Sequence, residues 1–185
     1  PDGGGIVENM LRGVDALEAT APVLICSVDI PLVTAEAVRD LVARCEAAGA
    51  ELCYTAVRRD VMEAAFPGSG RSYRPLVEGD LCGGDINWVA PQVIQRNIAF
   101  ARELTARRKS AWALARLMGP GILARLLVRR LRLRDLERRG GKLLGCTCQA
   151  ILSPYAELAM DVDKPHHLAV VLRAMERSRG GATAG

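Results

Sequence analysis

The sequence predicts an α/β protein with three α/β/α layers around a mostly parallel, doubly wound sheet. Its 185 residues are enough for one domain, and half of them are hydrophobic. Residues 22–28 form a near-continuous apolar run, which is typical of a strand buried on both faces of a parallel sheet. A helix and a second strand follow up to residue 57, and this order predicts a right-handed crossover.

Apolar spacing and capping residues predict two helices in the first part of the chain. Residues 6–18 carry apolar side chains three and four positions apart, which indicates an amphipathic helix. A second helix is expected over residues 35–48, where Thr34 can cap the first turn and Gly49 can end the last.

The remaining strands and the closing helix are predicted from β-branched runs and from breaker residues. Strands are expected over residues 51–57, 72–77, 83–90 and 146–152. The closing helix is expected over residues 165–178, because Pro165 is favoured at the first position of a helix.

Positive charge is concentrated in one block, residues 96–142. This block holds 14 Lys and Arg residues against three Asp and Glu, whereas residues 1–95 hold 7 against 14. Helices are predicted in this part of the chain over residues 91–107, 110–118 and 121–139, with a break at Gly119-Pro120. We therefore expect a basic helical insertion in a single domain spanning residues 1–185, and an anionic partner for it.

Three explanations are open for the basic block. The first is an exterior helix that packs on the domain through an apolar stripe formed by Leu123, Leu126, Leu127 and Leu131. The second is peripheral contact with an anionic membrane. The third is nucleic acid, which we do not expect, because aromatic residues make up only 4% of the chain and no helix-turn-helix spacing is present.

Two aspartates are the best candidates for chemistry. Asp29 directly follows the first strand, and Asp163 ends a short apolar stretch before the closing helix. Ligands of open parallel sheets collect at the carboxyl ends of the strands, where two carboxylates can hold Mg²⁺ or Mn²⁺. Considered separately, Asp29 could instead be a turn residue before Pro31, and Asp163 could be a helix cap. Together they favour a metal role.

Three motifs follow one another along the chain: Ser27-Val28-Asp29-Ile30-Pro31-Leu32, Gly83-Gly84-Asp85-Ile86-Asn87 and Asp161-Val162-Asp163-Lys164-Pro165. This ordered set resembles the MobA-like NTP transferase family, whose members are nucleotidyltransferases with a Rossmann-like sheet of the GT-A type. The resemblance covers most of the chain. It implies that Asp29 and Asp163 are catalytic residues that bind the metal.

The resemblance also implies a set of residues that bind the nucleotide or the acceptor. Gly5 and Asn9 match the segment that holds the nucleotide base, and the motif around Asn87 matches the wall of the acceptor pocket. The full set is Gly5, Asn9, Gly83, Gly84, Asn87 and Lys164. For Lys164, a solvated side chain at the start of a helix is the alternative to a phosphate contact.

The chain departs from the family pattern in two places. Gly3-Gly4-Gly5 is not the family's Gly-rich phosphate loop, because no strand precedes it, and Asp85 interrupts the Gly-Asn segment. We therefore expect an N-terminally truncated domain lacking roughly 60 residues, or about two βα units. Such a fragment would be inactive by itself.

The function implied is transfer of a nucleoside monophosphate from an NTP to a phosphorylated or hydroxyl acceptor, with release of pyrophosphate. The expected location is the cytoplasm, with membrane association as an alternative. A non-catalytic nucleotide-binding or membrane-associated protein on the same fold is the other function that the sequence leaves open.

Overall fold

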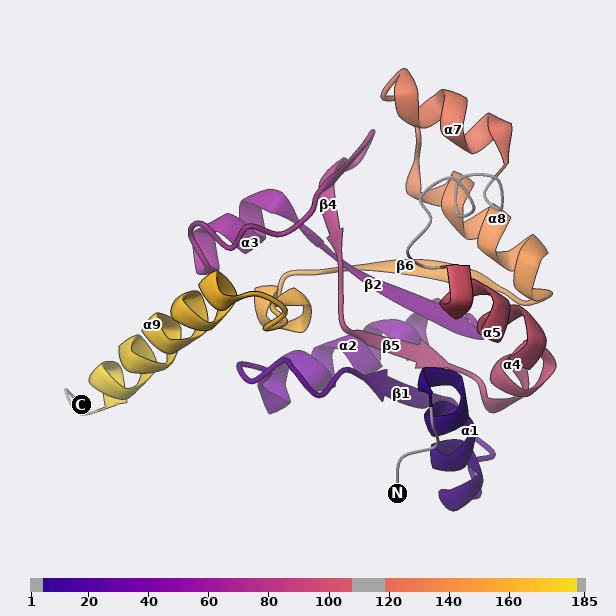
Figure 1. Cartoon of the computed structure of the whole chain (residues 1–185), viewed down its shortest axis with the longest axis horizontal. Coiled ribbons are helices and arrows are strands. Elements are labelled where there is room, and N and C mark those ends of the chain that lie inside the picture. The colour runs from indigo at the N-terminus through magenta and orange to yellow at the C-terminus, as the bar shows by residue number, and fades with distance from the viewer. Residues whose placement is uncertain (1–4, 108–118, 183–185) are drawn as a thin grey trace.

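A six-stranded sheet forms the centre of the protein in the computed structural model, which describes residues 5–107 and 119–182 (Figure 1). The strands are β1 (Val23–Cys26), β2 (Leu52–Arg58), β3 (Arg74–Leu76), β4 (Gly79–Gly83), β5 (Ile86–Val89) and β6 (Cys148–Ser153). β5 lies between β1 and β2, and β6 pairs with β2.

The prediction of a mostly parallel sheet is not confirmed. Among the strand pairs of the described residues, β2 and β6 are parallel, whereas the pairs β1–β5, β2–β5, β2–β4 and β3–β4 are antiparallel. β1, β2 and β6 nevertheless run in one direction, because β5 is antiparallel to both of its neighbours. The reversal arises because the chain turns back through the β3–β4 hairpin and continues directly into β5, with no crossover helix between them.

The predicted strand over residues 83–90 begins only at Ile86, because the sheet splits at Gly84. β6 pairs along residues 52–57 of β2, so β4 and β5 must share the opposite edge of β2. Between them, the Gly84 N–H donates to the Thr55 carbonyl at 2.8 Å, and the Thr55 N–H donates to Asn87 Oδ1 at 3.0 Å. The split turns β4 away from the plane of β5 (Figure 1).

Side-chain alternation places helices on both faces of the sheet, as three layers require. Cys53 packs with α2 (Ala35–Ala48) on one face, while its neighbour Leu52 packs with α4 (Pro91–Arg96) on the other. α2 begins and ends as predicted, because Thr34 Oγ1 accepts the Ala37 N–H at 3.1 Å and Gly49 adopts a left-handed conformation.

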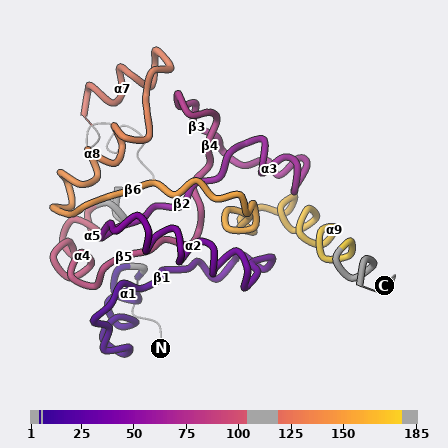
Figure 2. Tube along the Cα trace, turned by 180° about the vertical axis from the view of Figure 1, so that it is seen from behind, coloured from indigo at the N-terminus to yellow at the C-terminus, as the bar shows by residue number. Residues whose placement is uncertain are grey.

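The remaining helices surround the sheet. They are α1 (Ile6–Ala16), α3 (Arg59–Ala65), α5 (Ile98–Arg107), α7 (Pro120–Leu127), α8 (Leu133–Leu144), the 3₁₀ turn η1 (Ala156–Ala159) and α9 (Pro165–Ala182). α8 lies against β6, and α1 lies against α4 and α5. α3 was not expected from the sequence. It packs with η1 and α9 in a separate apolar cluster around Met62 and Val171 (Figure 2).

The basic block is less regular than predicted. The helix expected over residues 121–139 breaks into α7 and α8, because Arg129 takes a left-handed conformation with φ +53° and its neighbours cap α7. The apolar stripe is therefore not continuous: Leu131 is buried, but Leu127 is 84% exposed. The predicted helix over residues 110–118 lies outside the described residues.

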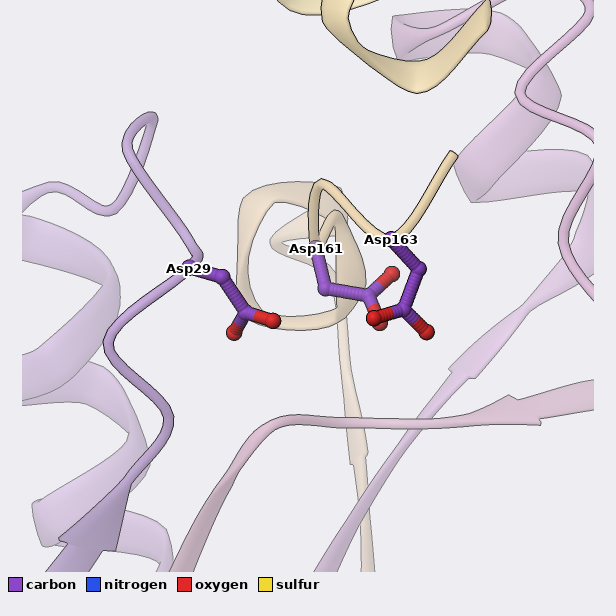
Figure 3. Close-up of side chains that lie close together, drawn as sticks. All are labelled: Asp29, Asp161 and Asp163. Atoms are coloured by element: carbon purple, nitrogen blue, oxygen red, sulfur yellow. The ribbon is translucent and has the colours of Figure 1, made fainter. Parts of the chain in front are cut away.

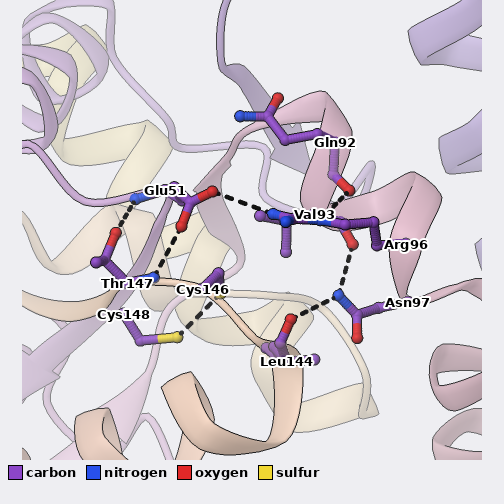
Figure 4. A network of polar contacts seen from close by, with 9 residues as sticks. All are labelled: Glu51, Gln92, Val93, Arg96, Asn97, Leu144, Cys146, Thr147 and Cys148. Atoms are coloured by element: carbon purple, nitrogen blue, oxygen red, sulfur yellow. Dashed lines mark hydrogen bonds and ion pairs between the residues drawn. The ribbon is translucent and has the colours of Figure 1, made fainter.

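A polar network joins the basic block to the start of β2 and β6 (Figure 4). The Glu51 carboxylate accepts the Thr147 N–H at 3.0 Å and pairs with Arg96 at 3.2 Å. The Asn97 side-chain amide donates to the carbonyls of Val93 and Leu144, both at 2.9 Å. Asn97 thus separates α4 from α5, where the sequence predicts one helix over residues 91–107.

Candidate functional site

Three aspartates come together beyond the carboxyl end of β1 (Figure 3). Asp29 follows β1, while Asp161 and Asp163 lie in the segment between η1 and α9. Carboxylate oxygens of the three lie within 4.8 Å of one another. The Val162 N–H donates to the Asp29 carbonyl at 3.0 Å, so a backbone hydrogen bond fixes the two segments together.

The cluster has the chemistry of a cation site. One oxygen of Asp29, Oδ1, is buried and has no hydrogen-bond partner among the described residues. Asp161 is only 8% exposed, whereas Asp163 is exposed. Converging carboxylates with an unsatisfied buried oxygen suit a hard divalent cation, because such ions prefer oxygen ligands and offset the mutual repulsion.

Arg71 supplies the counter-charge on one side of the cluster. Its side chain is 13% exposed and comes from the segment between α3 and β3. The guanidinium pairs with Asp161, approaches Asp85 at 3.5 Å and donates to the Gly83 carbonyl at 3.3 Å. Sequence reasoning missed this residue, because an arginine in an irregular segment carries no motif.

Asp85 lies at the split between β4 and β5 and is held through its backbone. Its N–H donates to the Leu158 carbonyl at 2.8 Å, and its carbonyl accepts the Ser27 N–H at 2.9 Å. Burial raises the pKa of the Asp85 carboxyl to about 6; Arg71 opposes this shift, and the charges of Asp29 and Asp163 add to it. The Asp85 carboxyl therefore titrates at about pH 6.

His167 supports the loop that carries Asp163. It is 3% exposed, and its Nδ1 accepts the Asp163 N–H at 3.3 Å. Burial, followed by the positive groups nearby, lowers the pKa of His167. A neutral ring that accepts at Nδ1 carries its proton on Nε2, so His167 acts here as a hydrogen-bonding support of the loop.

An open groove of about 640 Å³ leads along α1 and β1 to the acidic cluster. Of the predicted site residues, Asn9, Asp29, Gly84 and Asn87 line it. Gly5 lies just before α1, where its carbonyl accepts the Asn9 N–H at 2.9 Å. The structure thus places residues from three distant parts of the sequence along one groove.

Three of the predicted site residues, Gly83, Gly84 and Lys164, make contacts within the fold. A Cβ on Gly83 would meet the hydroxyl of Tyr54, an exposed side chain that can move aside, whereas one on Gly84 would lie 2.8 Å from the Thr55 side chain and 3.2 Å from the Leu158 carbonyl oxygen. Gly84 is therefore the glycine that the close approach of β2 requires. Lys164 is exposed, and its carbonyl accepts the His167 N–H at 2.9 Å at the start of α9.

The sheet, the groove and the acidic cluster define an α/β protein with an open groove that ends at a group of carboxylates. The family model of the MobA-like NTP transferase domain matches residues 1–145. A solved structure described as a hypothetical transferase from Thermus thermophilus is 36% identical, with a TM-score of 0.83 over 91% of this chain and 71% of that chain. No curated protein matches. The chain belongs to the MobA-like NTP transferase family.

Proposed function

We propose that the protein is a metal-dependent nucleotidyltransferase that transfers a nucleoside monophosphate from an NTP to a phosphorylated or hydroxyl acceptor. The observation that carries this proposal is the group of Asp29, Asp161 and Asp163 at the end of the groove. Family membership supports an NTP as the donor. The acceptor is a small molecule or a lipid-linked group.

In the proposed reaction, an oxygen of the acceptor attacks the α-phosphorus of the NTP. A new P–O bond forms, the bond to the bridging oxygen of the β-phosphate breaks, and pyrophosphate leaves. Such chemistry depends mainly on positioning the reactants and on neutralising charge. The groove that ends at the charged cluster supports this proposal, because donor and acceptor would both have to reach that cluster.

Different residues are proposed to bind the metal and to bind the substrates. Asp29 and Asp163 would hold Mg²⁺ or Mn²⁺, which supplies positive charge to the phosphate oxygens when bound. Asp161 is engaged by Arg71 and would complete the negative side of the cluster. Asn9 and Asn87 offer amide groups along the groove, and we assign them, with Gly5, Gly84 and Lys164, to contacts with the nucleotide or acceptor.

Replacing Asp29 tests the proposal. Asp29→Ala in the full-length protein is expected to lower transfer at least about a hundredfold, because metal charge stabilises a transition state by several kcal/mol. Transfer is measured as pyrophosphate release from each common NTP, with Mg²⁺ and a panel of sugar-phosphate and alcohol acceptors.

The matched control is Asp40→Ala, which removes an aspartate paired with Arg44 on the outer side of α2. This variant should keep wild-type transfer. Both variants should unfold in urea at nearly the wild-type midpoint. An Asp29→Ala protein that still transfers nucleotides at the wild-type rate would contradict the assignment.

A further inference from the structure

The turn after α7 exposes apolar and positive side chains together. We name residues 127–134 the basic tip. Leu127 is 84% exposed and Val128 is 62% exposed, although both are large aliphatic residues. Four arginines of the same eight-residue stretch are exposed, and the stretch contains no acidic residue: Arg129, Arg130, Arg132 and Arg134.

The acidic residues beside the basic tip face inward. Asp135 is buried, pairs with Arg125 and accepts the Arg132 N–H at 3.2 Å. Glu137 accepts the Ala150 N–H of β6 at 2.9 Å. Glu78, from the β3–β4 turn, accepts the Leu133 N–H at 3.2 Å. These carboxylates are used for packing and backbone contacts, so the outer surface of the tip stays positive.

The fold holds the tip outward. α7 stands apart from the sheet in both views (Figures 1 and 2), and none of its residues is buried. The Val77 N–H donates to the Leu131 carbonyl at 2.9 Å, which fastens the tip to the β3–β4 turn. Leu131 is buried at this contact, so the exposed residues on either side of it project from an anchored turn.

We propose that the basic tip docks the protein on the surface of an anionic lipid bilayer. Arginines are attracted by negative headgroups, while Leu127 and Val128 can enter the boundary between headgroups and acyl chains. Nucleic acid would satisfy the arginines, but it offers no apolar phase for two aliphatic side chains. Among the described helices, none is both long and apolar enough to cross a membrane.

Co-sedimentation of the full-length protein with vesicles tests this docking. The wild-type protein should bind vesicles of phosphatidylcholine with phosphatidylglycerol and should not bind phosphatidylcholine alone. Arg129→Gln with Arg130→Gln should lower the partition coefficient about 30-fold, because each cation near such a surface contributes about 1 kcal/mol. Leu127→Ser with Val128→Ser should lower it at least about tenfold through lost apolar burial.

The matched control is Arg39→Gln with Arg173→Gln, which removes two exposed arginines from α2 and α9 and should leave binding unchanged. The proposal is overturned if the wild-type protein ignores anionic vesicles, or if the tip and control variants bind equally well. It is also overturned if the serine variant binds as the wild type does while a short DNA duplex displaces the vesicles. Pyrophosphate release from soluble substrates is a separate readout, so loss of docking and loss of transfer can be told apart.

Discussion

Four carboxylates and one buried guanidinium set the charge of the candidate site. Arg71 pairs with Asp161 and approaches Asp85, but Asp29 and Asp163 have no such cation among the described ion pairs. Negative charge therefore remains on the side of the cluster nearest the groove. Arg71 offsets one of the four negative charges, and a divalent cation bound there would offset two more.

Asp85 should make the stability of the protein depend on pH. Burial raises its pKa from the ordinary value of 3.8 to about 6, so between these values the folded protein holds a proton that the unfolded chain has lost. Stability should therefore fall as the pH rises from about 4 to about 6 and then level off. Asp85→Asn should remove this loss, which is on the order of 3 kcal/mol.

Urea unfolding of the wild-type protein and Asp85→Asn at a series of pH values, with a chelator present, measures the difference. Asp80→Asn is the control, because Asp80 is exposed on β4 and pairs with the exposed Arg59. Parallel stability curves for the wild type and Asp85→Asn across the window would show that Asp85 does not titrate as described.

The sequence identifies the metal-binding candidates better than it identifies their supports. Asp29 and Asp163 are predicted from their places after a strand and before a helix, and the structure brings both into one cluster. Asp161 is part of the same motif, but it was not singled out. Arg71 depends on contacts across the fold, and no local pattern distinguishes it from a solvated residue. His167 makes a local contact with the Asp163 N–H, but its position at the start of a helix does not by itself indicate that contact.

At the level of the elements, the segment around Gly84 shows that a strand can be predicted correctly while its direction in the sheet is predicted wrongly. The apolar residues predict a strand, but its direction depends on the route of the chain from β2. Gly84 permits the split between β4 and β5, because a side chain there would meet Thr55 and the Leu158 carbonyl. The alternation of apolar and polar residues along a strand indicates which face of the sheet each side chain lies on, but it does not indicate the direction in which the strand runs.

Two glycine substitutions should therefore have opposite effects. Gly84→Ala should lower the free energy of unfolding by about 1–3 kcal/mol, because its Cβ would lie 2.8 Å from Thr55 and 3.2 Å from the Leu158 oxygen. Gly13→Ala should raise it by about 0.5–1 kcal/mol, because Gly13 lies inside α1 with no atom within 4 Å of an added Cβ. Urea unfolding midpoints test the pair. Equal midpoints for the two variants would contradict the close approach.

The basic block also shows the limit of helical spacing. Its apolar residues predict a stripe, and a continuous helix would have kept Leu127 and Leu131 on one side. The backbone hydrogen bonds that end α7 run from Arg129 to Leu126 and from Arg130 to Arg125, a motif that usually has glycine in the left-handed position. Because an arginine occupies that position, the sequence signal for a helix end is missing.

Across the described chain, charge separates into one acidic region and one basic region. The acidic cluster lies beyond β1, and the basic tip lies beyond the β3–β4 turn. The layered α/β arrangement is predictable from the sequence, because it follows from the spacing of apolar residues within each helix and each strand. The strand directions and the position of the basic tip are not, because they depend on connections between distant segments. The single-domain organisation over residues 1–185 stays a prediction.

Divalent cations should therefore stabilise the folded protein. Ions that bind the folded cluster and not the unfolded chain raise the free energy of unfolding, by about 2.7 kcal/mol at a hundredfold excess over the dissociation constant. The gain should disappear in Asp163→Asn and persist in Asp40→Ala, whose carboxylate lies on the outer side of α2. Urea unfolding with MgCl₂, compared with KCl at equal ionic strength, separates binding from screening. If KCl stabilises the protein as much as MgCl₂ does, the three aspartates hold no specific ion, and the charge left by Arg71 is balanced by solvent alone.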